Sequence, residues 1–382
     1  MTWPMYSPAC RKAVDALLRK GGSLSAYRAN PLFPSWTGPQ EGSYAYRLER
    51  EIERRFKVRH AVAVNSGTAA LQAAIAASLP KPRDASGEII VSPYTFSATA
   101  AAIVLAGFTP VFADVDPYSF CISPETVKRV VTKNTRAILP VHLFGGMADV
   151  RGLQALGLPV IEDACQAVGA RNGDGFSGTL GLAGCYSFNG TKNIPAGEAG
   201  CLVTNSDKVA EAARLFMNHG ENFHQREVSG NGRMNELTAC VAYHGLLELD
   251  ERNDRRRELA WSLRKHLRLN GFWDWEDRRL GPAWFPEEGE WDTHVFYVYP
   301  FLIGHDRSKF IKRMSKHNIP VGAGYITPPL HKYPAFRKYA RGHLPVVEEL
   351  SSKTLCILST LTPDRNISCS RKVAQAMRES LR

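Results

Sequence analysis

Lys192 stands in the stretch CYSFNGTKNIPAGEAG (185–200), a glycine- and proline-containing loop that follows a short apolar run. A lysine on an ordinary solvated surface needs no such setting, whereas a lysine that must reach a fixed point in a cleft does. In a cleft, the amine of Lys192 could attack a carbonyl group and form a Schiff base. The simpler alternative is a solvated loop lysine.

A carboxylate, Asp163, closes the apolar run LPVIED (158–163), which has the composition of a strand buried on both faces. A buried carboxylate is costly unless it has a partner. The protonated ring nitrogen of a cofactor would be such a partner. The alternative is an aspartate that caps the following turn, which is a common arrangement.

The turn Asn65-Ser66-Gly67-Thr68 follows another apolar run and precedes an alanine-rich helical segment. At the N-terminus of a helix, backbone N–H groups, hydroxyl groups and the positive end of the helix dipole point toward one place, where an anion can bind. The alternative is an ordinary helix cap provided by Ser66 or Thr68. For the turn taken alone, this alternative is the simpler explanation.

Together with Ser187, in the run GCYSF (184–188), these residues are the parts that pyridoxal 5'-phosphate requires. Lys192 would form a Schiff base with the aldehyde, and Asp163 would keep the pyridine nitrogen protonated so that the ring accepts electrons. The turn at Gly67 would hold the phosphate. Each part is weak alone, but their order and their positions at strand ends strengthen the prediction.

Short β-rich runs alternate with helical segments between residues 59 and 205, which predicts an α/β fold with a mainly parallel sheet covered on both faces. Right-handed crossovers bring the C-terminal ends of such strands, and the residues that follow them, to one edge of the sheet. The seven predicted strands are HAVAV (60–64), EIIVS (88–92), TPVFAD (109–114), RAILPVHL (136–143), LPVIED (158–163), GCYSF (184–188) and GCLVTN (200–205).

The rest of the chain predicts a helix at about 8–19, a loop-rich stretch at 218–246 and a long charged helix after it. Beyond that helix, the strand-like HVFYVYPFLI and the helical DRSKFIKRMSKH indicate a smaller α+β unit. We therefore expect a large domain, residues 1–250, and a small C-terminal α+β domain, residues 251–382.

The composition limits the possible compartment and partners. The chain has 382 residues, no apolar run of membrane-span length and no secretory signal pattern, so we expect a cytoplasmic protein without a membrane partner. Its eight cysteines form no CxxC pair and its eleven histidines show no metal-ligand spacing, so we expect reduced thiols and no metal. The net charge of +11 favours an anionic partner.

The order of these motifs resembles the DegT/StrS family of pyridoxal-phosphate-dependent aminotransferases, which act mostly on sugars and have the type I (aspartate aminotransferase) fold. The resemblance runs from about residue 43 to 251 and more weakly to the C-terminus. The segments that carry it are AVNSGTAALQAAIAA, VSPYTFSATAAAI, PVFADVDP, LPVHLFGGMADV, IEDACQAVGA, SFNGTKNIPAGEAG, MNHGEN and NGRMNELTACVA.

The resemblance implies a role for particular residues. Lys192 would be the Schiff-base lysine and would carry protons between substrate and cofactor. Phe96 would stack on the ring, Gln166 would lie near its hydroxyl group, and Asn231 would reach the phosphate of the neighbouring subunit in a homodimer with shared sites. His331 matches, less firmly, a segment that lines the substrate cleft. The remaining cofactor-binding residues implied are Gly67 and Thr68 with Ser187 for the phosphate, and Asp163 for the pyridine nitrogen.

Several positions depart from the family pattern. Ala199 replaces a glycine, Gly232 replaces an aromatic residue, and Leu182 replaces an aspartate. The pair Asn189-Gly190 stands where a pair that often begins with histidine is usual. None of these positions is a cofactor-binding residue, so the departures bear on the substrate.

The function indicated is amino transfer from glutamate or glutamine to a keto sugar or a keto cyclitol. For the keto sugar, we expect a nucleotide-linked form. Lys192 separates the chain from sugar dehydratases of the same fold, which carry histidine there. One alternative is another pyridoxal-phosphate reaction, decarboxylation or elimination. The other is a nucleic-acid-associated protein that retains the fold, suggested by RNDRRR (252–257) and HKYPAFRKYARGH (331–343). A solvated helix explains the first stretch better, and a cleft-lining segment implied by the resemblance explains the second better, so nucleic acid is not the expected partner.

Overall fold

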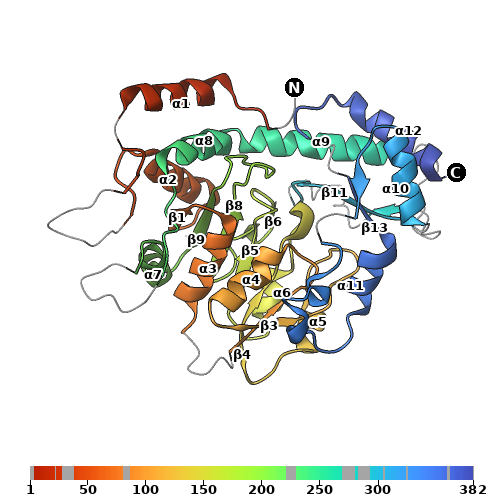
Figure 1. Cartoon of the computed structure of the whole chain (residues 1–382), viewed down its shortest axis with the longest axis horizontal. Coiled ribbons are helices and arrows are strands. Elements are labelled where there is room, and N and C mark those ends of the chain that lie inside the picture. Colours follow the sequence, from red (N-terminus) through yellow and green to blue (C-terminus); the bar gives the residue numbers. More distant parts are fainter. Residues whose placement is uncertain are drawn as a thin grey trace.

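The computed structural model describes residues 4–21, 23–27, 38–80, 87–220, 229–268, 280–282, 293–303, 306–323, 326–358 and 362–381. They form a larger α/β part and a smaller α+β part, and helix α9 (Leu249–Arg268) extends from one toward the other along the upper side in Figure 1. In the described residues, no helix combines the length and the apolar character needed to cross a membrane.

Seven strands of the large part overlap the seven predicted runs. They are β1 (His60–Val64), β2 (Glu88–Val91), β3 (Thr109–Phe112), β4 (Thr135–Leu139), β5 (Ile161–Asp163), β8 (Ala183–Ser187) and β9 (Gly200–Thr204). A short hairpin of β6 (Arg171–Asn172) and β7 (Gly175–Phe176) precedes β8. The match is close because buried strands rich in β-branched residues, separated by helices, give a clear sequence signal.

The seven strands pair in two parts, in the orders β1-β9-β8-β5 and β3-β2-β4. Two isolated parallel bridges, Ile138 to Val160 and Val141 to Asp163, join the parts between β4 and β5. The pairings of β9 with β1 and β8 are antiparallel, and the others in these two parts are parallel. The sheet is therefore mainly parallel, as predicted, although its ladder is not continuous across the junction.

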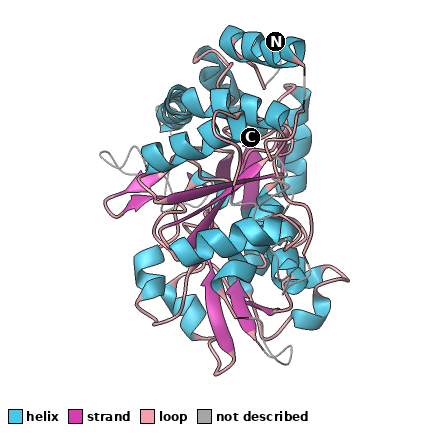
Figure 2. Cartoon of the chain, turned by 90° about the vertical axis from the view of Figure 1, so that its left-hand side faces the viewer, coloured by secondary structure: helices cyan, strands magenta, loops and turns pink. Residues whose placement is uncertain are grey.

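Both faces of the sheet are buried, and β1 shows this residue by residue. Val62 and Val64 belong to one apolar cluster, whereas Ala61 and Ala63 belong to a second cluster on the opposite face. Side chains alternate between faces along a strand, so each face must be covered. Figure 2 shows helices on both sides of the strands. In the large part they are α2 (Tyr44–Phe56), α3 (Gly67–Ser78), α4 (Ser97–Leu105), α5 (Pro124–Lys128), α6 (Val150–Gln154), α7 (Asp207–Met217) and α8 (Glu236–Leu247), and α1 (Pro8–Lys20) packs on α8.

The loop-rich stretch predicted at 218–246 is partly wrong, because α8 occupies its second half. The sequence of α8, ELTACVAYHGLL, is apolar on most sides and so lacks the amphipathic period by which helices are recognised. A start signal is nevertheless present, since the Asn235 side chain accepts the N–H of Thr238, 2.9 Å away. Residues 221–228 lie outside the described residues.

The C-terminal part contains an antiparallel sheet in the order β10-β11-β13-β12, which confirms its α+β character. The strands are β10 (Leu280–Pro282), β11 (Tyr299–Ile303), β12 (Val321–Gly322) and β13 (Leu355–Leu358), and α9, α10 (Arg307–Lys316) and α12 (Ser368–Leu381) accompany them. Phe301, Phe310 and Met377 are among the residues of their shared apolar core.

One segment of the C-terminal half packs on the large part. The N–H group of Leu330 donates to Pro93 O, and Asp114 at the end of β3 accepts the N–H groups of Val346 and Val347 at the start of α11 (Pro345–Glu349), at 3.1 and 3.0 Å. This aspartate caps a helix far away in sequence. The division of the chain at residue 250 stays a prediction.

Three of the four arginines of RNDRRR are buried, so this stretch forms no continuous basic surface. The solvated-helix interpretation holds only for its exposed side, where Arg255 pairs with Glu258. Arg252, Arg256 and Arg257 are buried. Arg256 donates to the carbonyl oxygens of Phe296 and Tyr297, both at 3.1 Å. Buried guanidinium groups need such acceptors, and the backbone between α9 and β11 supplies them.

Candidate active site

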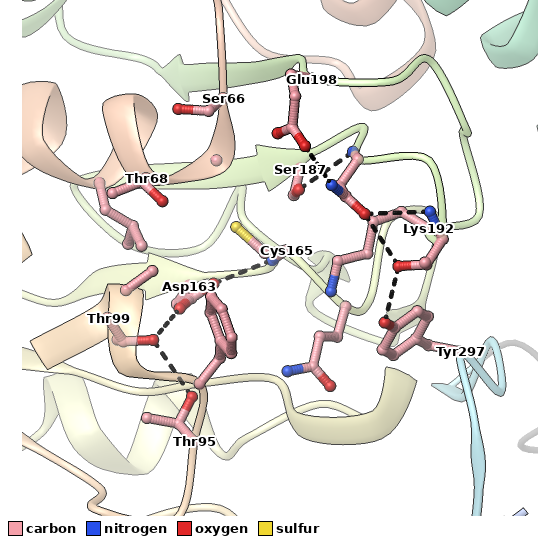
Figure 3. Close-up of a pocket in the computed structure, with 17 residues that line it drawn as sticks. Ser66, Thr68, Thr95, Thr99, Asp163, Cys165, Ser187, Lys192, Glu198 and Tyr297 are labelled. Atoms are coloured by element: carbon pink, nitrogen blue, oxygen red, sulfur yellow. Dashed lines mark hydrogen bonds between the residues drawn. The ribbon is translucent and has the colours of Figure 1, made fainter. Parts of the chain in front are cut away.

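A cavity of about 390 Å³ opens at the C-terminal ends of β1, β5 and β8. These three strands run parallel, so the turns that follow them meet at one edge, as the sequence predicts. The lining residues are Ser66, Gly67, Thr68, Leu71, Thr95, Phe96, Ala98, Thr99, Asp163, Cys165, Gln166, Ser187, Asn189, Thr191, Lys192, Glu198 and Tyr297 (Figure 3). Seven of the eight residues to which the sequence assigns a cofactor role are among them.

The turn after β1 forms a cradle at the N-terminus of α3, opposite Ser187. The Ser66 hydroxyl accepts the N–H of Ala69 at 3.1 Å, so Ser66 is the helix cap that the simpler interpretation proposes. Gly67 lets the turn pack closely against Ser187 and Cys165, because a Cβ atom there would lie 2.8 Å from Ser187 Cβ and 2.9 Å from Cys165 Sγ. The turn is therefore both a helix cap and a place where an anion can approach backbone N–H groups.

Asp163 is the buried carboxylate of the site, with 4% of its surface exposed. Its Oδ1 accepts the N–H of Cys165 at 3.1 Å, and its Oδ2 accepts the Thr99 hydroxyl at 2.8 Å. The turn-capping role that was the alternative for Asp163 is thus present as well. Because Asp163 also lines the cavity, it can accept a further hydrogen bond from a group bound there.

Lys192 lies on a braced loop after β8. Its backbone N–H donates to Asn189 O at 2.8 Å, and Gly190 N–H donates to Gly197 O at the same distance. Its Nζ lies 4.0 Å from the centroid of the Tyr297 ring, whose hydroxyl contacts the Thr191 hydroxyl at 3.2 Å. Lys192 is therefore not a freely solvated side chain, and its amine lines the same cavity as Asp163 (Figure 3).

Gln166 and Phe96 also line the cavity. The Oε1 atom of Gln166 accepts the N–H of Phe144 at 3.0 Å, which fixes this end of the amide as the acceptor. Phe96 is 53% exposed at the N-terminus of α4. A partly exposed aromatic side chain beside a cavity can stack on a planar ligand.

Two residues singled out from the sequence, Asn231 and His331, lie outside this lining, and so does His219 of the quoted segment MNHGEN. Asn231 is exposed, and its side chain accepts the N–H of Arg233 at 3.1 Å. His331 is buried in the C-terminal half, where burial, then Lys332, lowers its pKa. His219 has a left-handed backbone conformation with a φ of 64° and does not line the cavity either.

Of the positions that depart from the family pattern, Asn189 is the one whose side chain belongs to the cavity. Its amide donates to Glu198 at 2.9 Å and accepts the Thr191 hydroxyl at 3.1 Å. Ala199 is buried in the apolar cluster behind the loop. Gly232 is buried against Met217, whose sulfur would clash with any Cβ there. Leu182 is half-buried against the core and has no side chain in the cavity.

The sequence does not single out Thr95, Thr99, Thr191, Glu198 or Tyr297, which also line the cavity. Thr99 and Thr191 lie in two of the segments that carry the resemblance. Their hydroxyl groups lie close in sequence to Phe96 and Lys192, respectively, and this proximity is the signal that could identify them. Tyr297 carried no such signal, because it lies more than one hundred residues after Lys192 in a strand-like stretch.

Cys165 faces the same cavity as a neutral group. Burial is the main cause that raises the pKa of its thiol well above the ordinary value, and the nearby Asp163 adds to this. A thiol is a nucleophile only as the thiolate, so Cys165 is not the nucleophile of this cavity. All eight cysteines are free, and six of them are buried.

The residues present fit pyridoxal 5'-phosphate. The turn at Gly67 forms an anion cradle at a helix N-terminus, Asp163 offers a buried carboxylate, and Lys192 brings a primary amine into the same cavity. These are the donors that a phosphate needs, the acceptor that a protonated ring nitrogen needs and the nucleophile that an aldehyde needs.

Comparison with known proteins agrees with this chemistry. The sequence model of the DegT/DnrJ/EryC1/StrS aminotransferase family matches residues 32–374. A pleiotropic regulatory protein of Geobacillus stearothermophilus is 34% identical over 83% of this chain and 84% of its own length. A UDP-N-acetyl-3-dehydro-α-D-glucosamine 3-aminotransferase of Acidithiobacillus ferrooxidans is 35% identical over 83% of each chain. The crystal structure of DesV of S. venezuelae, in complex with a ketimine intermediate, has a TM-score of 0.82 and 28% identity over 97% of this chain and 94% of its own.

Proposed function

Because this chain belongs to the DegT/DnrJ/EryC1/StrS aminotransferase family, whose members depend on pyridoxal phosphate, we propose that it moves an amino group from glutamate or glutamine to a keto sugar or keto cyclitol. The observation that carries the proposal is the presence of Lys192, Asp163 and the Gly67 cradle in one cavity. When bound, the cofactor supplies an aldehyde for the amine and a ring that accepts electrons from the reacting carbon.

We propose that the protein's own groups divide the work as follows. The backbone N–H groups at Gly67 and Thr68, with the Ser187 hydroxyl, bind the phosphate. Asp163 accepts a hydrogen bond from the ring nitrogen, and Phe96 covers the ring. The amine of Lys192, held near Tyr297, takes and returns a proton at the substrate carbon, which is general acid–base catalysis by a positioned side chain.

The nature of the acceptor is supported by charge and by likeness. The relative from A. ferrooxidans, by its name, acts on a UDP-linked keto sugar. This chain carries a net charge of +11, which favours anionic substrates such as nucleotide-linked sugars. Asn189, the cavity residue at which the chain departs from the family pattern, can distinguish among acceptors because its amide faces the same space as Lys192.

We propose a homodimer in which Asn231 serves the partner's site. In its own chain Asn231 is exposed and does not line the cavity, as a residue that acts across an interface would require. The eight free cysteines support a reducing compartment, and we propose the cytoplasm.

The visible absorbance of the purified protein tests the function. With pyridoxal phosphate the wild type should show a Schiff-base band that L-glutamate or L-glutamine converts to the amine form, and Lys192→Ala should show neither band nor conversion. Addition of a UDP-linked 3-keto sugar should restore the first band and yield the amino sugar by mass spectrometry. A keto cyclitol that restores the band while the keto sugar does not would assign the second acceptor class.

Decarboxylation or elimination on the same scaffold is the alternative reaction. It would be favoured if neither glutamate nor glutamine changed the band, and turnover of either donor with a keto acceptor would exclude it as the main activity. Association with nucleic acid has less support, since three of the four arginines of RNDRRR are buried and the fourth, Arg255, pairs with Glu258. The relative from G. stearothermophilus is named a pleiotropic regulatory protein, but this name does not state that it binds nucleic acid.

A further inference from the structure

Two threonines that also line the cavity join Asp163 in a hydrogen-bonded series. The Thr99 hydroxyl donates to Asp163 Oδ2 at 2.8 Å, and the Thr95 hydroxyl lies 3.2 Å from that of Thr99. Both threonines are buried, with 1% of Thr95 and 2% of Thr99 exposed. Figure 3 shows the two hydroxyls and the carboxylate side by side at the end of the cavity.

The direction of the two hydrogen bonds follows from the proton count. An ionised carboxylate is only an acceptor, so the single hydroxyl proton of Thr99 must point to Asp163. In the second contact Thr99 has no proton left to give, and Thr95 must be the donor. The order is therefore Thr95 to Thr99 to Asp163, and each donor polarises the next group.

The backbone holds this series in place. Thr99 lies in the first turn of α4, where its N–H donates to Phe96 O at 3.2 Å, and Thr95 comes just before that helix. The other oxygen of the carboxylate accepts the N–H of Cys165. Asp163 is thus fixed from two sides, and rotation of its carboxylate would break one of these bonds.

We infer that Thr99, supported by Thr95, is a positioning residue that orients the Asp163 carboxylate toward the ring nitrogen and limits how strongly it attracts the ring proton. The inference rests on the role proposed for Asp163. A hydrogen bond donated to a carboxylate stabilises its charge, so the ring keeps its proton. Without Thr99 the proton would move toward Asp163, and the ring would lose part of its positive charge.

The loss should be visible in the spectrum of the bound cofactor. A less positive ring withdraws fewer electrons, so the nitrogen shared with Lys192 would keep its proton to higher pH. In Thr99→Val the pH midpoint of the visible band should therefore rise by about half a unit or more, and the cofactor should bind more weakly. The maximal rate of the half-reaction with glutamate should fall about tenfold, with little change in the glutamate KM, because a hydrogen bond to a charged group is lost.

Three further variants separate positioning from general destabilisation. Thr99→Ser retains the donor and should restore the wild-type midpoint. Thr95→Val removes the second donor and should shift the midpoint in the same direction by less. Thr204→Val is the matched control, because Thr204 is 3% exposed and its hydroxyl donates to Leu182 O at 2.7 Å, away from the cavity. It should lower thermal stability and leave the midpoint unchanged.

An unchanged midpoint in folded Thr99→Val, or an equal shift in Thr204→Val, would overturn the inference while leaving the proposed function intact. If Thr99→Val does not fold, Thr95→Val decides alone: a raised midpoint supports the series and an unchanged one refutes it. No cofactor band on the wild-type protein would contradict the proposed function, and this inference with it.

Discussion

Lys192 Nζ lies 4.0 Å from the centroid of the Tyr297 ring, although the two residues are more than one hundred positions apart in the sequence. The backbone carbonyl oxygen of Tyr297 accepts a hydrogen bond from Arg256 of α9. The Tyr297 hydroxyl contacts the hydroxyl of Thr191, the residue before Lys192. The C-terminal half of the chain thus contributes a wall to a cavity otherwise built by the large sheet. This wall restrains the lysine on the side away from the strands.

Replacement of Tyr297 tests that restraint. Attraction between a cation and an aromatic face contributes about 0.5–2 kcal/mol. Tyr297→Ala should therefore lower kcat/KM by a factor of about 2 to 30. Tyr297→Phe keeps the ring and loses only the contact with Thr191, so it should remain within about twofold of the wild type. Steady-state kinetics with glutamate distinguish them, and equal losses in both variants would show that the hydroxyl, and not the ring face, is important.

Gly67→Ala tests the phosphate cradle. The new methyl group would lie within 3 Å of Ser187 Cβ and Cys165 Sγ, so the turn must move and alter the proposed phosphate site. Affinity for pyridoxal phosphate, measured by fluorescence titration, should fall at least tenfold. Gly173→Ala is the matched control, since a Cβ atom there meets nothing within 4 Å. Unchanged affinity in Gly67→Ala would place the phosphate elsewhere.

Asp163→Asn tests the charge at the ring nitrogen. The amide keeps the size of the carboxylate but cannot stabilise a protonated ring, so the rate of the glutamate half-reaction should fall about 10- to 100-fold, the range expected for a hydrogen bond to a charged group. Stopped-flow absorbance measures this rate. Asp174→Asn, on the exposed hairpin where Asp174 pairs with Arg151, should react as the wild type does. A fast Asp163→Asn half-reaction would remove Asp163 from its proposed role.

The sequence predicted the part of the site that one sheet creates. Lys192, Asp163 and Gly67 each follow a buried strand, and parallel strands that end at one edge must bring such residues together. Strand length and composition are local properties, so these positions could be inferred without coordinates. Thr99 was overlooked because, in the sequence, it is one more small residue in an alanine-rich helix.

Tyr297 and the arginines of α9 could not be predicted in the same way. The burial of Arg256 and Arg257 results from packing of α9 against residues 293–298. This contact produces no periodic hydrophobic pattern in the sequence. Mixed charges along a helix normally indicate a solvated face. The same pattern here belongs to a helix whose guanidinium groups bind backbone carbonyls and thereby place Tyr297.

His294, in that same segment, should make the stability of the protein depend on pH. Burial, with a smaller effect of the nearby Arg257, lowers the pKa of His294 to about 3. Its Nδ1 accepts the N–H of Phe296 at 2.9 Å, so the neutral ring is the form that fits. Between about pH 6.5 and pH 3, the unfolded chain binds a proton at this residue and the folded chain does not. Stability should therefore fall as the pH decreases through this window.

From pH 7 to pH 5, this one group should lower the free energy of unfolding by about 2 kcal/mol. His294→Asn can still accept the Phe296 N–H but does not titrate. In chemical unfolding of the cofactor-free proteins, the free energy of unfolding should therefore decrease from pH 7 to pH 5 by about 2 kcal/mol less in this variant than in the wild type. His343→Asn, at an exposed histidine, should keep the wild-type difference. Identical pH responses in the wild type and His294→Asn would contradict this prediction. They would mean that the folded protein accommodates a charged imidazole ring between α9 and residues 293–298.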